Sequence, residues 1–253
     1  AAVRAARNGP EHTQEPVKRA LTRPTAPPAA PALVGSAQLR VPADQIWSRP
    51  VPEPAFEQFR AWTFAYLASD SSHRTALTEE GVTLAKNRRE SLLPLIQSAP
   101  EIALDRSVPM HVRQQLPEEV LELLEERMDG RGDFSVFASL PVPGQEGEVP
   151  PSWRTVHLGD RLFTAHVYGR RLDEPTRNDI PLHGLALENH LALDENPVRI
   201  LEAAESEEAL EGDPVCGVAG WQASAFESEV AVHDGDDAPV TLCSPAHAEE
   251  LNR

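Results

Sequence analysis

The chain has 253 residues, 40% of them hydrophobic, so it is long enough and apolar enough to bury a core. Its formal charge of −17 disfavours nucleic acid as a partner, because binding to phosphates needs clustered Lys and Arg. No apolar run approaches the roughly 20 residues that cross a bilayer, so we expect no membrane span.

Residues 1–54 predict a Pro-rich extended arm. Ten prolines lie in this stretch and favour polyproline conformations, which bury no core of their own. We expect Ile46 and Trp47 to anchor its end on the folded part. Charge is also uneven, with a net +4 over residues 1–50 and a net −21 over residues 51–253. An arm of this kind makes an assembly subunit one alternative, in which the arm wraps a neighbouring chain.

Residues 55–130 predict a helical segment. Apolar side chains recur at helical spacing from Ala55 to Leu67, and polar residues then interrupt the pattern. A second helix is expected to begin near Thr78, where two glutamates suit the positive end of a helix. Pro94 predicts a kink in this helix or the start of a new one.

The end of the helical segment is expected to hold a turn and one more helix. The turn is predicted over residues 102–108. The helix is predicted over Pro117–Met128, because proline suits a first turn and apolar residues share one face. Gly130 is expected to end it.

Residues 131–201 predict a small antiparallel β unit, because the apolar period changes to two after Asp133. Strands are expected at residues 134–140, 154–158, 162–168, 183–187, 191–193 and 198–201. So many short strands indicate a barrel or sandwich. His157 and His166 flank the tight-turn sequence Gly159-Asp160 and are expected to meet across a hairpin as structural residues.

The predicted fold class is therefore α+β: a helical layer, a small antiparallel β barrel or sandwich, and a short Cys/His β-hairpin and helix module. An acidic linker at residues 202–212 leads into that module, which takes residues 213–253.

Both cysteines lie in the module, with the spacing C-x26-C-x3-H over Cys216, Cys243 and His247. Thiolate and imidazole are the ligands that zinc or copper prefers. Structural zinc sites usually take four ligands, so the site is either incomplete or completed by a residue such as His233. In an exported chain, a Cys216–Cys243 disulfide competes with the metal.

Three resemblances bear on function. Asp213-Pro-Val-Cys-Gly217 followed by Cys243-Ser-Pro resembles the YHS/TRASH family of small metal-binding modules. This resemblance implies that Cys216 and Cys243 are metal ligands, and it puts His247 where that family has a further cysteine. Pro214-Val-Cys-Gly-Val218 is also similar to the cysteine switch of secreted zinc-metalloprotease propeptides, in which a thiolate excludes water from the catalytic zinc.

The third resemblance covers the body of the chain. It looks like the N-terminal, propeptide-like region of large secreted bacterial multidomain proteins of the metallopeptidase type. The matching runs are Leu77–Arg89, Val112–Pro117, Gly130–Asp133, Val167–Leu172 and Pro181–Leu187. In that group the region precedes other modules, so the resemblance implies a non-catalytic leading region. Its partners would be other chains or other domains of the same precursor.

The motifs for catalysis are missing from the sequence, since it has no G-x-S-x-G, H-E-x-x-H, P-loop or G-x-G-x-x-G. We therefore expect no enzyme, but a structural, interaction or propeptide-like region of an exported protein. The main alternative is a zinc- or copper-binding module. The start at Ala1-Ala2 without Met fits removal of a signal peptide, which predicts a secreted, periplasmic or cell-surface location.

Overall fold

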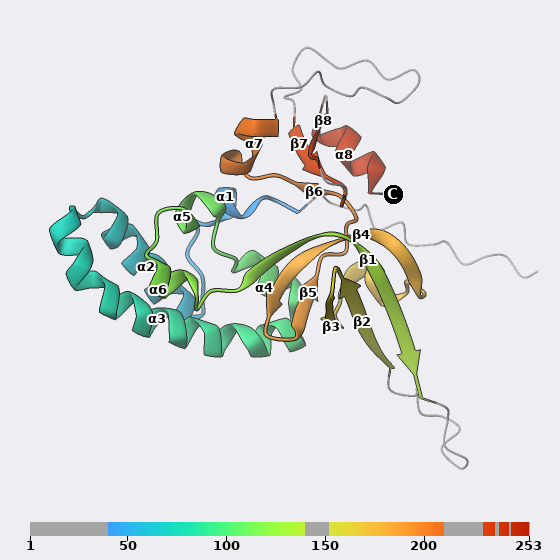
Figure 1. The fold of residues 1–253 in the computed structure, drawn as a ribbon, viewed down its shortest axis with the longest axis horizontal. Coiled ribbons are helices and arrows are strands. Elements are labelled where there is room, and N and C mark those ends of the chain that lie inside the picture. The colour runs from blue at the N-terminus through green and yellow to red at the C-terminus, as the bar shows by residue number, and fades with distance from the viewer. Residues whose placement is uncertain (1–39, 140–151, 210–229, 236–237, 243, 253) are drawn as a thin grey trace, which may run out of the picture. The chain divides into compact units, whose positions relative to one another are not determined.

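The computed structural model describes residues 40–139, 152–209, 230–235, 238–242 and 244–252, all within one compact unit that begins at Ala37 (Figure 1). This part is α+β, with a layer of helices, a closed five-stranded barrel and a three-stranded sheet. The predicted class and small barrel are confirmed. The Cys/His module is not shown, because Cys216 and Cys243 lie outside the described residues. Within the described ranges, no helix is long and apolar enough to cross a membrane.

Two long helices carry the helical layer: α2 (Pro54–Ala68) and α3 (Ser71–Ser98). The proline of α2 suits a first turn, where a missing N–H costs nothing. Asp70 caps α3 by accepting hydrogen bonds from two backbone N–H groups of its first turn. The helix was predicted to begin near Thr78, but this cap starts α3 at Ser71. Pro94 lies inside α3 and does not begin a new helix.

A glycine lets α2 and α3 approach closely. A Cβ atom at Gly81 would lie 2.1 Å from the ring of Trp62, so only glycine leaves room for that ring. The indole N–H of Trp62 donates to the carbonyl of Leu77 at 3.0 Å. Phe59 and Tyr66 pack on the same ring, with centroids 5.5 and 5.1 Å away. These aromatic contacts form the core of the helical layer.

The remaining helices are short. They are α1 (Ala43–Ile46), α4 (Pro100–Asp105), α5 (Met110–Arg113), α6 (Glu118–Leu121), the 3-10 helix η1 (Gly169–Leu172), α7 (Ala203–Ala209) and α8 (Pro245–Leu251). Two predictions are corrected by them. The turn expected over residues 102–108 is helical as far as Asp105, and most of the expected acidic linker is α7.

The helix predicted over Pro117–Met128 is wrong. The helical turn α6 covers only Glu118–Leu121, and the strand β1 (Glu126–Ala138) follows almost at once. Leu124 is still buried in the helical layer. The apolar residues that were expected to share one face of a long helix therefore belong to the single turn α6 and to the residues that follow it. Gly130 does not end a helix but lies inside β1, which pairs with strands on both sides. Pairing along both edges of a long strand outweighs local helical spacing.

The barrel has five strands in the order β1-β2-β3-β5-β4, and β4 closes it against β1. The other four strands are β2 (Ser152–Leu158), β3 (Arg161–His166), β4 (Arg177–Leu187) and β5 (His190–Leu193). The barrel was predicted to be antiparallel, but β3 and β5 run parallel, so it is mixed. Alternate residues fill its interior, among them Phe134, Val156, Phe163, Leu182 and Leu191.

The strand predicted at residues 198–201 lies outside the barrel. It is β6 (Arg199–Ile200), which pairs with β7 (Val230–His233), and β7 pairs in turn with β8 (Val240–Leu242). Val198, Val232, Leu242 and Ala248 form a separate small core beneath this sheet.

The C-terminal half of β4 joins the barrel to the helical layer. From Leu182 to Leu187 every residue is buried, because one side of the strand faces the barrel interior and the other is covered. Leu185 and Leu187 pack with Leu92 and Ile96 of α3. The helices thus cover the part of the barrel from which the candidate site is built.

Candidate functional site

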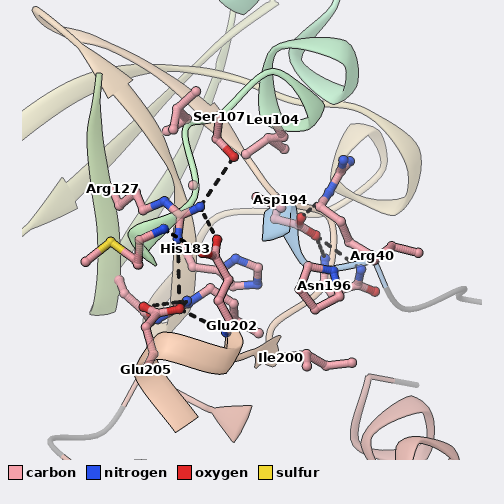
Figure 2. Close-up of a pocket in the computed structure, with 18 of the residues that line it drawn as sticks. Arg40, Leu104, Ser107, Arg127, His183, Asp194, Asn196, Ile200, Glu202 and Glu205 are labelled. Atoms are coloured by element: carbon pink, nitrogen blue, oxygen red, sulfur yellow. Dashed lines mark hydrogen bonds and ion pairs between the residues drawn. The ribbon is translucent and has the colours of Figure 1, made fainter. Parts of the chain in front are cut away.

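A cavity of about 280 Å³ lies where the N-terminal segment, the barrel and the chain around β6 meet (Figure 2). It is nearly twice the roughly 150 Å³ cavity that suffices to bind benzene in a protein core. One wall comes from Arg40 and α1, another from β1 and β4, and a third from residues 194–205. Each wall comes from a different part of the chain, and the site exists only in the folded protein.

Strand pairing places two polar side chains side by side in the cavity. Asp129 of β1 lies opposite His183 of β4 in the antiparallel register, so both project from the same face of the sheet. Their neighbours two residues along, Arg127 and Leu185, share that face and also line the cavity. The opposite face of these strands points into the barrel.

Arg40 fastens the N-terminal segment to the cavity. Its Nε donates to Oδ2 of Asp194 at 2.7 Å, and its Nη2 donates to the hydroxyl of Tyr168 at 2.6 Å. It also forms an ion pair with Asp105. Burial works in the opposite direction, but the His183 ring in its protonated form and the guanidinium of Arg40 hold the pKa of Asp194 below its usual range. Asp194 is therefore an ionised carboxylate, although its side chain is almost fully buried.

A second network of ion pairs lies at the part of the cavity formed by β1, β6 and α7. Nε of Arg199 donates to Oδ2 of Asp129 at 2.6 Å, and its Nη1 donates to Oε2 of Glu205 at 2.9 Å. Arg127 pairs with the buried carboxylate of Glu202, and its Nη1 lies 3.9 Å from Oε2 of Glu205. Glu202 lies in the predicted acidic linker, yet it is a buried acceptor and not a solvated charge. The network connects β1 to β6 and α7.

His183 is the residue in the cavity that lacks a hydrogen-bond partner where one is needed. The residue is 6% exposed, and its Nε2 atom is buried with no partner among the described residues. Burial lowers the pKa of His183 below the ordinary value, against the opposing effect of Asp194 and Asp129. The ring is therefore neutral, and an unpaired polar atom of this kind costs about 1–3 kcal/mol. A ligand in the cavity that pairs with Nε2 would remove this cost.

The cavity also holds Ser107, but the geometry does not form a catalytic triad. Oγ of Ser107 accepts a hydrogen bond from Arg127 at 3.4 Å. Among the described residues, no hydrogen bond joins the ring of His183 to Ser107 or to Asp194. A triad needs the base in contact with both its nucleophile and its orienting carboxylate. The arrangement present can hold a ligand by hydrogen bonds and charge.

The residues predicted as metal ligands are only partly described. Cys216 and Cys243 lie outside the described residues, so the metal site and the competing disulfide both stay predictions. His247 is buried in α8, where its backbone N–H donates to Oγ of Ser244 at 3.3 Å. His233 lies with Nδ1 2.8 Å from Oδ1 of Asp129. In the described part of the chain, no group of three or more His, Cys, Asp or Glu could hold a metal ion.

The predicted contact between His157 and His166 is wrong. The β2–β3 register places His157 opposite Leu162. His166 instead contacts His190 across the parallel β3–β5 pair, with Nε2 and Nδ1 3.0 Å apart. Only the parallel pairing of the two strands brings these histidines together.

Sequence reasoning did not select the cavity residues. One usable signal was His183 inside Pro181-Leu-His-Gly-Leu-Ala-Leu187, since a lone polar residue in an apolar strand needs a reason to be buried. Comparison of the chain with protein-family models, curated proteins and solved structures finds no match. The assignment of a functional site here is therefore supported by the geometry of the cavity alone.

Proposed function

We propose that this chain is a non-catalytic interaction region of a larger exported bacterial protein, and that its described part binds a small ligand or a protruding side chain in the cavity. One observation carries the binding proposal: His183 lines a cavity with a largely apolar wall, and its Nε2 atom is buried without a hydrogen-bond partner among the described residues. Small-molecule sites typically combine an apolar lining with a few placed polar groups.

The arrangement of charges supports binding over catalysis. The arginines of the cavity donate to carboxylates, and Ser107 is engaged by Arg127. Groups that are held in this way orient a ligand and shape its site, whereas a nucleophile needs an adjacent free base. The resemblance to propeptide-like leading regions supports the exported context and partners within the same precursor.

Binding can be tested with three probes of one shape: 3-phenylpropylamine, 3-phenylpropanol and 3-phenylpropionate. We expect at least one of them to bind with a dissociation constant of about 1 mM or tighter. Binding would be measured by saturable shifts of the backbone amides of His183 and Ile200 in ¹H–¹⁵N spectra.

Two tryptophan variants localise the binding. Val41 lines the cavity and is 42% exposed, so Val41→Trp obstructs the site without entering a core. Leu162 on β3 is 65% exposed and lies outside the cavity, which makes Leu162→Trp a matched control. We expect only Val41→Trp to weaken binding. If none of the probes binds, or if both variants weaken binding equally, the cavity is not the binding site.

A further inference from the structure

The cavity carries an excess of negative charge. Three guanidinium groups face four carboxylates there, and burial keeps His183 neutral. The charged residues are Arg40, Arg127, Arg199, Asp129, Asp194, Glu202 and Glu205. Asp105 shares Arg40 from outside the cavity and adds to the excess. The nearby Arg171 is balanced by its own ion pair with Glu174.

Two of the four carboxylates act on the His183 ring. Asp194 and Asp129 oppose the lowering of its pKa, whereas Arg199 and Arg171 act in the opposite direction. The arginines direct N–H groups at these carboxylates, whereas no group of the described chain donates to Nε2 of His183. A positively charged donor placed at this atom would gain a hydrogen bond and the attraction of both carboxylates.

The rest of the cavity suits an apolar body. The apolar side chains that line it come from α1, the end of α4, α5, β4 and β6, and include Ile46, Leu104, Met110, Leu185 and Ile200. Since the cavity exceeds the size that holds benzene, a ring or a short aliphatic chain fits beside the polar end.

We propose that the cavity binds an organic ammonium ion, whose N–H group donates to Nε2 of His183 while its apolar body lies against the wall formed by Ile46, Leu104 and Ile200. This inference rests on the proposed binding function and names its ligand class. His183 then carries its proton on Nδ1 and accepts through Nε2. A carboxylate ligand would meet like charge from Asp194 and Asp129 and would find the arginines already paired.

An ammonium of this kind has two sources: a free amine or a lysine side chain of a partner protein. The three phenylpropyl probes differ only in the charge of the polar end, and N-acetyl-lysine methylamide represents the protein source. We expect the amine to bind about tenfold or more tightly than the alcohol and the carboxylate. The free energy of a hydrogen bond to a charged group corresponds to about that ratio of dissociation constants. Tighter binding of N-acetyl-lysine methylamide than of phenylpropylamine assigns the site to a lysine, and the reverse order assigns it to a free amine.

His183→Phe removes the acceptor and keeps a ring of similar shape. We expect this variant to lose about tenfold or more of the amine affinity. His157→Phe, at an exposed position of β2 outside the cavity, serves as the matched control and should leave affinity unchanged. In the unaltered protein, the ¹⁵N resonance of His183 Nε2 should move on titration with amine, which tests the contact even if the variant fails to fold.

The outcomes separate the two proposals. Binding of none of the four probes refutes the binding function itself. Equal or tighter binding of the alcohol or carboxylate refutes the ammonium assignment and leaves the binding function standing. An Nε2 resonance that stays fixed while the amine saturates the protein also overturns the assignment.

Discussion

A buried ionic cluster beneath the helical layer makes a strong prediction about stability. Glu125 has a fully buried side chain, and its Oε1 accepts from the backbone N–H of Val108 at 2.9 Å and from Nη2 of Arg113 at 2.6 Å. Its other oxygen pairs with Arg88, which is 1% exposed. The cluster ties α3 to the segment between α4 and α5 and to the start of β1.

Glu125→Gln removes the negative charge and keeps the size and shape of the side chain. Burial alone would raise the pKa of Glu125, but Arg88 and Arg113 lower it from 4.5 to about 2. A shift of that size corresponds to about 3 kcal/mol of stability. Breaking a buried ion pair on one side typically costs about 3–5 kcal/mol, because the partner charge stays buried. We therefore expect Glu125→Gln to lower the free energy of unfolding by about 3 kcal/mol at pH 7.

The effect should depend on pH in a defined direction. Because the folded-state pKa of Glu125 is depressed, its contribution is fully present above the unfolded value of 4.5. It is lost as the pH falls through the folded value of about 2. The difference between wild type and variant should therefore shrink steadily from pH 5 towards pH 3.

Urea unfolding followed by tryptophan fluorescence at pH 7, 5, 4 and 3 would measure this difference. Glu122→Gln removes a carboxylate from an exposed position nearby and serves as the control, with little expected effect. A destabilisation below about 1 kcal/mol at pH 7, or one that is the same at every pH, would refute the argument.

Three further predictions concern contacts elsewhere. Gly81→Ala should destabilise the fold by about 1–3 kcal/mol in thermal unfolding, because its Cβ atom would overlap the ring of Trp62; a gain in stability, the usual result of Gly→Ala inside a helix, would contradict the packing. Burial and then His190 lower the pKa of His166, so folding stability should fall as pH drops below the ordinary value; in His190→Gln the pKa of His166 should rise in an NMR titration, and an unchanged pKa would count against the contact. Arg40→Gln removes the anchor of the N-terminal segment and should speed amide hydrogen exchange in the residues that follow; unchanged exchange would show that the anchor is dispensable.

The elements that were predicted correctly have local causes. The helix expected from Ala55 to Leu67 corresponds to α2 and follows from apolar spacing, although its first residue, Pro54, was assigned to the arm. β2 and β3 follow from alternation on either side of Gly159-Asp160, where the glycine takes a positive φ that suits a tight turn. In each case the residues that decide the structure are neighbours in the chain.

The failures share a different cause. The spacing up to Leu124 fits a helix, but pairing with two strands turns residues 126–138 into β1. The parallel β3–β5 pair likewise replaced the expected contact of His166 with one to His190. Such pairings depend on segments far away along the chain, whereas local spacing indicates only which side of an element is apolar.

The sequence by itself determined an acidic α+β protein with helices followed by short strands, because composition and apolar period act locally. Only the tertiary structure decided the candidate site. Arg40 and Asp194 lie 154 residues apart in the chain, yet their side chains form an ion pair at the cavity. His183 meets Asp129 only through strand register. Apolar periodicity predicts which side of an element is buried. Which charged side chains surround a buried polar group depends on how distant segments of the chain pack against one another.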